Sequence, residues 1–474
     1  MGDLRGVIDR LDYIADLGVN AIWLSPIFES PMHDFGYDIS DYCAIDPVFG
    51  SLGDLDELLG LAHARNIRVI LDWVPNHTSI EHPWFKESRS SLDNPRRDWY
   101  VWRERGHDGA LPNNWVRAWS DLPAWTLDSE TGQYYLHCFL PEQPDLNWDK
   151  VEVRAAMKDV MKFWLDRGID GFRMDVVHLI GKEVEANDDP ELAGLTHVAL
   201  NDVGVTHDYL REIRATLDAY DDRVSIGEVV LFDPERVATY YGNNDELHLS
   251  FNFASLMTPW RAKSWAELIT ITEATHQKVN AWPTWVLSNH DNVRVASRLG
   301  GHREKVRSAL VLLLTLRGTP FLYAGEELGL LDAVVPPERV VDPGGRDGCR
   351  APIPWTTEEG YGWAEPWLPF VEDAASSSVA AQTADDDSVL AFARRLLAVR
   401  ATYAALRRGD IENVVAEGDV LSFERCDTQS RLRVIINFGP DAATLEAPGT
   451  NVLTSHRSER HELAPYGAVV IALD

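Results

Sequence analysis

The sequence has no long apolar run and few cysteines, and each absence excludes a class of protein. No stretch approaches the roughly 18 apolar residues that suggest a membrane span. No cationic start is followed by an apolar segment, so no signal peptide is expected. The four cysteines, Cys43, Cys138, Cys349 and Cys426, lack metal-ligand spacing. We expect reduced structural thiols, which fit a cytoplasmic protein.

Basic residues are also scarce relative to acidic ones. The chain has 44 Lys and Arg against 75 Asp and Glu, for a net charge of −31. A surface of this sign repels the phosphates of nucleic acids and anionic lipids, so we expect neither as a partner. The length of 474 residues is enough for a large core and two or three domains.

Apolar, β-rich runs alternate with amphipathic helical stretches such as 52–64, 153–167 and 303–316. Continuous apolar strands separated by helices indicate parallel pairing with both faces covered. This many units predicts an α/β fold of the (β/α)₈ TIM-barrel type rather than an open sheet. The predicted strands are 20–26, 67–74, 171–176, 224–229, 249–253, 283–288 and 320–324.

Two segments and the tail depart from this alternation. Residues 78–147 have little helical period, and an excursion of that length predicts an inserted domain. Residues 327–365 are rich in Gly, Pro and Asp and predict a long loop. A helix over 387–406 is followed by short alternating runs, which predict a small antiparallel β domain. The expected domains are therefore a barrel over 1–77 and 148–405, an insertion over 78–147 and a C-terminal β domain over 406–474.

Four predicted strands end in acidic, amide or histidine side chains, at 72–77, 171–175, 227–229 and 288–291. In barrel enzymes the carboxyl ends of the strands carry the active site. Hydrolysis of a glycosidic bond needs one carboxylate that stays ionised and one carboxyl group that protonates the leaving oxygen. The sequence therefore predicts a carboxylate-lined site for chemistry on a sugar acetal.

Arg173, Asp175 and Glu228 are the first candidates for these roles. Arg173 and Asp175 are two residues apart, so on a strand they point to the same face. We expect the cation to depress the pKa of Asp175 and keep it anionic. Glu228 has no basic neighbour in its own segment, and a less polar setting would raise its pKa and suit it to be the acid.

Each candidate alone also has a structural explanation. Arg173 and Asp175 could be a buried ion pair, and Glu228 a salt-bridge partner at a strand end. The histidines of the first and last motifs could be structural, and Asp291 could cap a helix. These explanations lose force because all the groups converge on one predicted face of the barrel.

The segments, in this order and spacing, resemble glycoside hydrolase family 13, the α-amylase superfamily, over nearly the whole chain. The resemblance implies a retaining mechanism, with carboxyl groups about 5–5.5 Å apart. It makes Asp175 the nucleophile that forms a covalent glycosyl intermediate, Glu228 the general acid and then base, and Asp291 the third carboxylate. Other residues match positions that contact the sugar or the nucleophile, namely Tyr37, His77, Arg173 and His290.

Within the family the chain resembles the α-glucosidase and oligo-1,6-glucosidase branch. Residues 143–147 are similar to a signature beside the inserted domain, and 347–350 to a loop after the last barrel strand. In relatives, positions matching Asp34 and Arg350 pair on the terminal glucose, which closes the pocket and makes attack exo-acting. Arg350 could at the same time hold its loop. Val176 is a residue often found in relatives that prefer α-1,6 links.

The start of the chain departs from the family pattern. We expect the first barrel strand to be missing, together with a cation-binding loop of which only Asp3 has a match. No metal and no cofactor are therefore expected. A barrel lacking one strand would expose two sheet edges.

The expected function is that of a retaining exo-acting α-glucosidase on short oligosaccharides or disaccharides, with a lean to α-1,6 links. An alternative is a transglucosylase or isomerase of the same family, such as a trehalose synthase or a sucrose-cleaving enzyme. Another is a non-catalytic interaction module. The three intact carboxyl residues argue against the module, and the missing strand argues for it.

Overall fold

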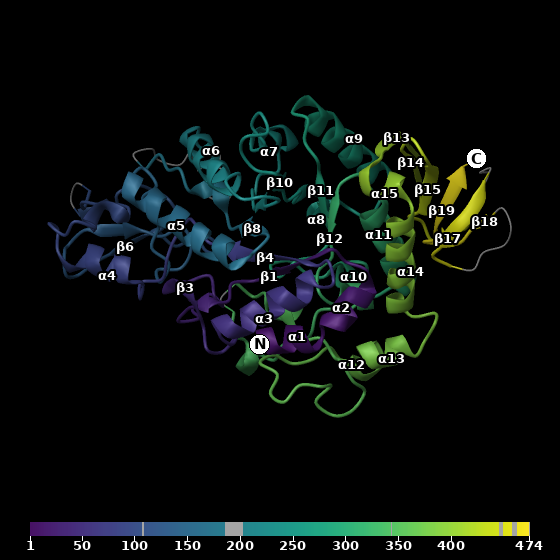
Figure 1. Cartoon of the computed structure of the whole chain (residues 1–474), viewed down its shortest axis with the longest axis horizontal. Coiled ribbons are helices and arrows are strands. Elements are labelled where there is room, and N and C mark those ends of the chain that lie inside the picture. The colour runs from purple at the N-terminus through teal and green to yellow at the C-terminus, as the bar shows by residue number, and fades with distance from the viewer. Residues whose placement is uncertain (107–108, 185–201, 343, 445–448, 457–461, 474) are drawn as a thin grey trace. The chain divides into compact units, whose positions relative to one another are not determined.

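The computed structural model describes residues 1–106, 109–184, 202–342, 344–444, 449–456 and 462–473 (Figure 1). The chain divides into two compact units. The N-terminal unit comprises Gly2–Leu11 and Asn20–Ser250, and the C-terminal unit comprises Met1, Asp12–Val19 and Phe251–Asp474. The predicted domain boundaries after residues 77, 147 and 405 stay predictions.

The N-terminal unit is built on five parallel strands whose order follows the sequence. They are β1 (Ala21–Leu24), β4 (Arg68–Trp73), β8 (Gly171–Met174), β9 (Val224–Gly227) and β10 (Leu249–Ser250). All of β8 and all of β4 after its first residue are buried, as the continuous apolar runs predicted. Gly171 allows β8 and β9 to approach, because a Cβ there would lie 2.2 Å from the Val224 carbonyl oxygen.

Two helices of this unit, α3 (Leu52–His63) and α5 (Val151–Arg167), lie where the sequence predicted helices over 52–64 and 153–167. The unit also contains α1 (Leu4–Asp9), α6 (Val205–Leu217) and α7 (Pro234–Thr239), whereas α2 (Leu11–Leu17) falls in the C-terminal unit from Asp12 onward. A reciprocal capping box between Ser51 and Asp54 starts α3. Gly168 ends α5 with a φ of 107°, a left-handed conformation that glycine adopts without a steric penalty.

The segment between β4 and α5 carries secondary structure of its own. It begins with α4 (Pro83–Ser90) and η1 (Arg97–Trp99), whereas the short pair β2 (Phe28–Glu29) and β3 (Asp41–Ile45) lies earlier, between β1 and α3. An antiparallel sheet follows, in the order β5 (Trp102–Arg103), β7 (Tyr134–Leu136) and β6 (Trp125–Leu127). A small core includes Val101, Trp115, Trp125 and Leu136. This sheet and core explain why 78–147 shows so little helical period.

The C-terminal unit contains the parallel pair β11 (Thr284–Val286) and β12 (Thr319–Phe321). The described residues thus hold seven strands in parallel pairs, and they overlap the seven predicted ones. The accompanying helices are α8 (Ala254–Met257), α9 (Ala262–Lys278), α10 (Val295–Arg298) and α11 (Arg303–Thr315). The long loop predicted over 327–365 is confirmed, with only short turns of 3₁₀ helix at η5 (Glu326–Leu328), η6 (Pro337–Arg339) and η7 (Asp347–Arg350).

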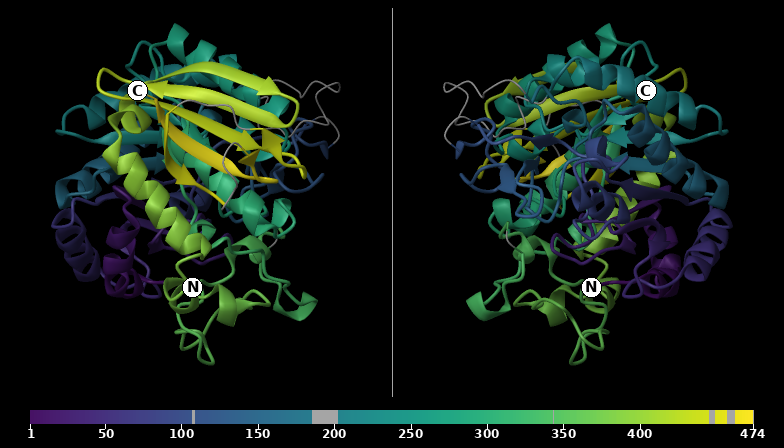
Figure 2. Two further views of the ribbon diagram at one scale, coloured as in Figure 1. Left: turned by 90° about the vertical axis from the view of Figure 1, so that its right-hand side faces the viewer. Right: turned by 90° about the vertical axis from the view of Figure 1, so that its left-hand side faces the viewer.

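The tail begins with α12 (Ala374–Ser377), α13 (Val379–Thr383), α14 (Val389–Thr402) and α15 (Ala404–Arg408). Its five-stranded antiparallel sheet confirms the predicted β domain (Figure 2). The sheet order is β13 (Asp410–Glu417), β14 (Val420–Cys426), β15 (Arg431–Asn437), β19 (Ala468–Leu473) and β17 (Thr450–Thr454). A second pair, β16 (Ala443–Thr444) and β18 (Glu462–Leu463), packs through Leu463 against Ile435 and Ile471.

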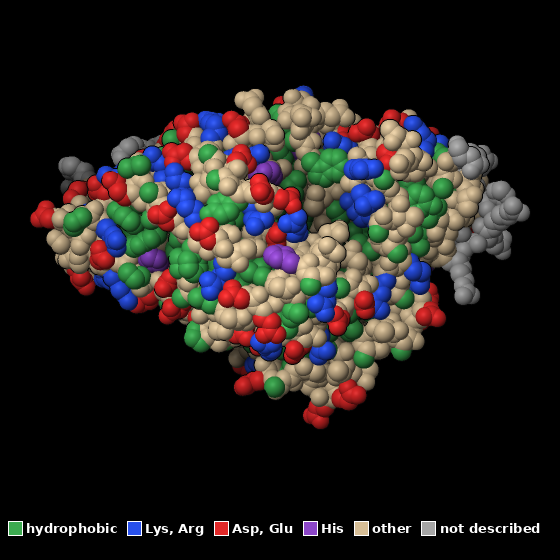
Figure 3. All heavy atoms as spheres, in the orientation of Figure 1, with side chains coloured by type: hydrophobic (Ala, Val, Ile, Leu, Met, Phe, Trp, Pro, Cys, Tyr) green, Lys and Arg blue, Asp and Glu red, His purple; other side chains and the backbone are tan. Residues whose placement is uncertain are grey.

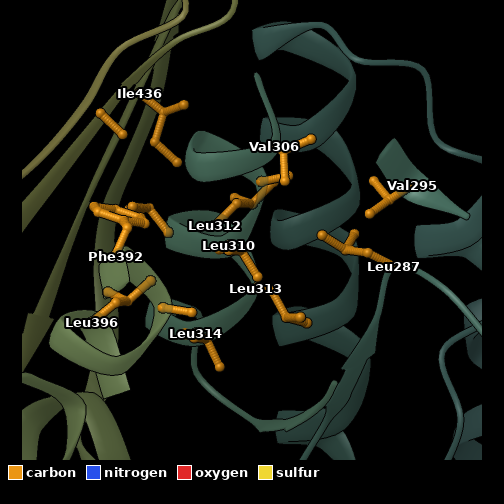
Figure 4. Close-up of a cluster of buried hydrophobic side chains, with 14 of the residues drawn as sticks. Leu287, Val295, Val306, Leu310, Leu312, Leu313, Leu314, Phe392, Leu396 and Ile436 are labelled. Carbon is orange, nitrogen blue, oxygen red and sulfur yellow. The ribbon is translucent and has the colours of Figure 1, made fainter. Parts of the chain in front are cut away.

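Helix α11 is the centre of the large core of the C-terminal unit. Every residue from Val306 to Thr315 is buried, so the helix is covered on all sides. Figure 4 shows its leucines between Leu287 and Val295 on one side and Phe392, Leu396 and Ile436 on the other. The helix therefore joins the parallel strand pair to the antiparallel sheet through one core.

The surface is acidic and mixed in sign. On the face seen in Figure 3, Asp and Glu side chains are interspersed with Lys and Arg. No helix among the described residues is long and apolar enough to cross a membrane.

Candidate active site

The guanidinium of Arg173 joins three carboxyl groups at the carboxyl ends of adjacent strands. Asp72 on β4 lies opposite Arg173 on β8, and Glu228 follows the end of β9. Backbone hydrogen bonds continue past the strand ends, from Asp175 N to the Trp73 carbonyl at 2.9 Å and from Glu228 N to the Met174 carbonyl at 2.8 Å. The two residues are thus fixed by main chain as well as by side chains.

We call this group the Arg173 cluster; it consists of Asp72, Arg173, Asp175 and Glu228. The distances between the side chains of this cluster are short. Arg173 Nη1 donates to Asp72 Oδ1 at 2.9 Å and to Asp175 Oδ1 at 2.5 Å, while Nη2 donates to Glu228 Oε2 at 2.5 Å. All four side chains are under one-tenth exposed. One cation therefore faces three buried acids, and the group can hold a proton.

The pKa of Asp175 moves opposite to expectation. Burial raises it well above the usual range, Arg173 lowers it, and Glu228 and Asp72 raise it further. The pKa of Asp72 rises to about 6, also chiefly through burial. The prediction that Arg173 would depress the pKa of Asp175 is wrong in its net direction, because two acids from neighbouring strands share the same cation.

The surroundings of Glu228 also correct the sequence analysis. Its segment has no basic residue, yet Arg173 reaches it from the next strand. The backbone N–H of Val176 donates to Glu228 Oε2 at 3.1 Å. Val176 makes this contact from a left-handed conformation, with φ 33° and ψ 42°. A β-branched residue in that region is strained, and such strain is concentrated at functional sites.

Aromatic side chains complete this cluster. Tyr37 Oη donates to Asp72 Oδ2 at 3.0 Å, and Trp23 Nε1 donates to the same oxygen at 3.2 Å. The Arg173 guanidinium lies 5.1 Å from the ring centre of Trp23 and 5.8 Å from that of Tyr37. These bonds hold the carboxyl group of Asp72 in the cluster, whereas the contact of Tyr37 with a sugar stays a prediction.

His77 heads a second polar group in the N-terminal unit. Gln143 Nε2 lies 3.1 Å from His77 Nε2 and donates to Asp34 Oδ2 at 3.1 Å. Asn76 Nδ2 lies 3.1 Å from His77 Nδ1. Burial lowers the pKa of His77 to about 4, so its ring is neutral at pH 7. The structure thus brings the predicted residues Asp34 and His77 together through Gln143.

Asp291 follows β11 in the C-terminal unit and is held by two arginines. Arg346 Nη1 and Arg350 Nη2 each lie 3.0 Å from Asp291 Oδ1. His290 Nε2 is 3.4 Å from Asp291 Oδ2, and Arg350 Nε donates to the His290 carbonyl at 2.7 Å. Helix α10 begins at Val295 and Arg294 precedes it as the N-cap residue, so Asp291 is not the cap of that helix.

Asp342 completes this group, here called the Asp291 cluster (Asp291, Asp342, Arg346 and Arg350). Arg346 Nη2 donates to Asp342 Oδ1 at 2.6 Å, and Arg350 Nη1 is 3.7 Å from the same oxygen. Burial would raise the pKa of Asp342, but the bonds from Arg346 hold it below the usual range. The pairing of Asp34 with Arg350 that the family resemblance implies stays a prediction.

Sequence reasoning missed Asp342 and Arg346 of the Asp291 cluster. It also missed Lys182, whose Nζ donates to Asn76 Oδ1 beside His77 at 2.7 Å. Lys182 follows Asp175 by seven residues, and its side chain is only 5% exposed, which is rare for a lysine without a partner. Arg346 precedes the quoted motif 347–350 by one position, and Asp342 precedes it by five. Their position in a loop gave no periodic signal, and only their charge beside the motif could have pointed to them.

Asp3, the residue matched to a cation-binding loop, instead caps a helix. Its Oδ1 accepts from Gly6 N at 2.6 Å at the start of α1. Among the residues that the structure describes, no group of three or more His, Cys, Asp or Glu side chains is arranged to hold a metal ion.

The sequence matches the family model of the alpha-amylase catalytic domain over residues 1–409. A probable alpha-glucosidase of Rhizobium meliloti is 38% identical, over 94% of this chain and 87% of its own. An oligo-1,6-glucosidase of Bacillus cereus is 35% identical, over 94% of this chain and 88% of its own.

Solved structures give the same fold. An alpha-glucosyl transfer enzyme, XgtA, superposes with a TM-score of 0.92 at 38% identity, covering 99% of this chain and 95% of its own. The isomaltulose synthase SmuA of Protaminobacter rubrum superposes with a TM-score of 0.93 at 28% identity, covering 100% and 95%. The fold class is therefore the predicted (β/α)₈ barrel with a C-terminal antiparallel β sheet.

Proposed function

Because this chain belongs to the alpha-amylase family of glycoside hydrolases, we propose that it is a retaining, exo-acting α-glucosidase. Its substrates would be short α-glucosides, cleaved from the non-reducing end. The Arg173 cluster carries the proposal, because one guanidinium holds Asp175 and Glu228 side by side at the ends of adjacent strands. The names of the two curated relatives support the same substrate class.

In the first step, Glu228 protonates the glycosidic oxygen as its bond to C1 breaks, and an Asp175 oxygen bonds to C1. In the second step, the Glu228 carboxylate takes a proton from water, whose oxygen attacks C1 and releases Asp175. Arg173 contacts both carboxyl groups, so it can stabilise negative charge on whichever one bears it. The first step requires the proton of the cluster to lie on Glu228 and Asp175 to be ionised when the substrate is bound.

The remaining predicted residues would bind the sugar. We assign Asp291 to the ring hydroxyls, where its carboxyl group is held by Arg346 and Arg350. By the family resemblance, each of Asp34, Tyr37, His77, His290 and Arg350 would contact the substrate, and binding of the terminal glucose would make attack exo-acting. Val176, beside Glu228, supports the lean to α-1,6 links.

A second candidate is transfer of the glucosyl group to a sugar instead of water. The likeness to a glucosyl transfer enzyme and to an isomaltulose synthase favours it. Transfer and hydrolysis share the first step and differ only in the acceptor of the second.

All four cysteines are free thiols, which supports action in a reducing compartment such as the cytoplasm.

The test is product analysis with maltose, isomaltose, sucrose and trehalose. We expect glucose from at least one of them, released first as the α-anomer. First release of β-glucose would overturn the retaining mechanism, and new disaccharides in place of glucose would favour transfer. Asp175→Asn should abolish turnover in a folded protein, and Glu228→Gln should slow cleavage of the natural disaccharides. Full activity in either variant would reject the assigned role.

A further inference from the structure

The ammonium group of Lys182 is buried, donates two hydrogen bonds and forms one ion pair. Lys182 Nζ donates to Asn76 Oδ1 at 2.7 Å and to the Leu179 carbonyl at 2.7 Å, and lies 3.2 Å from Asp145 Oδ2. A protonated lysine has three donors and no acceptor. The side-chain atom of Asn76 that faces Lys182 must therefore be its oxygen.

This contact fixes the orientation of the whole Asn76 amide. With its oxygen on Lys182, its nitrogen points the other way, 3.3 Å from Asp145 Oδ1 and 3.1 Å from His77 Nδ1. Asp145 Oδ1 also accepts from Cys138 N at 3.0 Å. The ion pair thus holds both ends of the amide, with the cation on the oxygen and the carboxylate on the nitrogen.

His77 then has one ring nitrogen assigned. An amide nitrogen can only donate, so His77 Nδ1 must be the bare, accepting nitrogen. A neutral imidazole carries one hydrogen, which must lie on Nε2. The backbone of Tyr37 acts to raise the pKa of His77, as an accepting carbonyl does, and with Nδ1 occupied this interaction falls to Nε2.

Gln143 does not reverse the assignment. Its oxygen accepts from Leu140 N at 3.1 Å, so its nitrogen is the atom near His77 Nε2. The contact between Gln143 Nε2 and His77 Nε2 therefore brings together two nitrogens that both carry hydrogen. Each of them has its acceptor elsewhere. For Gln143 the acceptor is Asp34, and for His77 it is the Tyr37 carbonyl.

We propose that Asn76, oriented by the Lys182–Asp145 ion pair, is a positioning residue that fixes the neutral His77 ring as the tautomer with its hydrogen on Nε2. Through this chain of contacts His77 presents a donor on the side of Asp34 and Tyr37. The consequence for sugar binding rests on the proposed function: a glucose hydroxyl would meet a hydrogen-bond donor at His77, and its complementary acceptor at Asp34.

The direct test is nitrogen-detected NMR of the full chain labelled with ¹⁵N-histidine, near pH 7.5, with the His77 signals identified by their loss in His77→Gln. We expect a bare Nδ1 and a protonated Nε2. A protonated Nδ1 with a bare Nε2 overturns the proposal. This measurement needs no substrate, so it tests the proposed tautomer independently of the proposed glucosidase activity.

Variants on the two sides of the ring give matched outcomes. Asn76→Asp offers oxygen to both Lys182 and His77, so Nδ1 should gain a hydrogen. Gln143→Leu removes the donor near Nε2 and should leave the tautomer unchanged. A bare Nδ1 in folded Asn76→Asp, or a switched ring in Gln143→Leu, overturns the proposal. If Asn76→Asp does not fold, the spectra of the parent chain and of Gln143→Leu still decide.

Kinetics then link the tautomer to sugar binding. In Asn76→Asp, kcat/KM for an aryl α-glucoside should fall by about tenfold or more, the size expected when a donor is lost from a hydroxyl-binding site. An unchanged kcat/KM in a variant whose ring has switched would overturn the role in sugar binding.

Discussion

The Arg173 cluster and the Asp291 cluster use the same residue types in opposite proportions. In the first, one arginine serves three buried acids, and the pKa values of Asp72 and Asp175 are raised. In the second, two arginines serve two acids, and the pKa of Asp342 is lowered. The comparison teaches that the ratio of arginines to acids decides whether an acid in the cluster keeps a proton. The Arg173 cluster can hold a proton for chemistry. The Asp291 cluster holds its acids by ion pairs for binding.

The largest expected effect comes from removing the one cation of the first cluster. Arg173→Met leaves three buried acids without a cation, so we expect loss of turnover and a fall of about 3–5 kcal/mol in the free energy of unfolding. Urea denaturation with an activity assay measures both. Arg5→Met is the control, because Arg5 pairs with Asp54 and Glu57 at the surface and should cost less than about 1 kcal/mol. Equal losses in the two variants would contradict the comparison.

The two clusters should also respond to pH with opposite sign. Asp72 has a folded pKa of about 6, above the unfolded value of 3.8, so the native state binds its proton more tightly. Its contribution to stability is full below about pH 4 and is lost by up to about 3 kcal/mol as the pH rises through 6. Asp72→Asn should remove that loss, as urea denaturation between pH 4 and 7 would show.

Asp342→Asn is the matched variant in the second cluster. The folded pKa of Asp342 is lowered, so its stabilising contribution is present above the unfolded pKa and is lost as the pH falls through the folded value. This variant should therefore lose less stability on acidification than the parent chain. Changes of the same sign in Asp72→Asn and Asp342→Asn would break the comparison.

A smaller effect is expected from removing one of the two arginines of the Asp291 cluster. Arg346→Met takes away the bonds to Asp342 and one of the two to Asp291, while Arg350 remains within 3.7 Å of Asp342. We expect a loss of about 2 kcal/mol in stability, less than for Arg173→Met, and a higher KM for disaccharides. A loss as large as that of Arg173→Met would show that the second arginine does not compensate.

The sequence predicted what depends on local pattern. The seven parallel strands follow from continuous apolar runs, and the tail sheet follows from short alternating runs. The placement of Asp175 and Glu228 at strand ends follows from the acids that end two of the apolar runs. The direction of the pKa of Asp175 could not be predicted, because it depends on Asp72 and Glu228, which are distant in sequence and adjacent only across the strands. Lys182 was missed for the same reason, since its partners Asn76 and Asp145 come from two other segments.

The smallest expected effect leaves every charge of both clusters in place. Val176 packs with Phe139 and Leu179 and holds Glu228 only through its backbone, so Val176→Thr changes the wall beside the acid and little else. Following the family resemblance, we expect the ratio of kcat/KM for maltose to that for isomaltose to rise by about threefold to tenfold, with a stability change of about 1 kcal/mol. Assays on both disaccharides across pH measure this. A changed ratio of the two kcat/KM values would assign the choice of linkage to the side chain at position 176. An unchanged pH profile in the same variant would show that the proton used in catalysis depends on the Arg173 cluster. An unchanged ratio would place linkage choice outside residue 176.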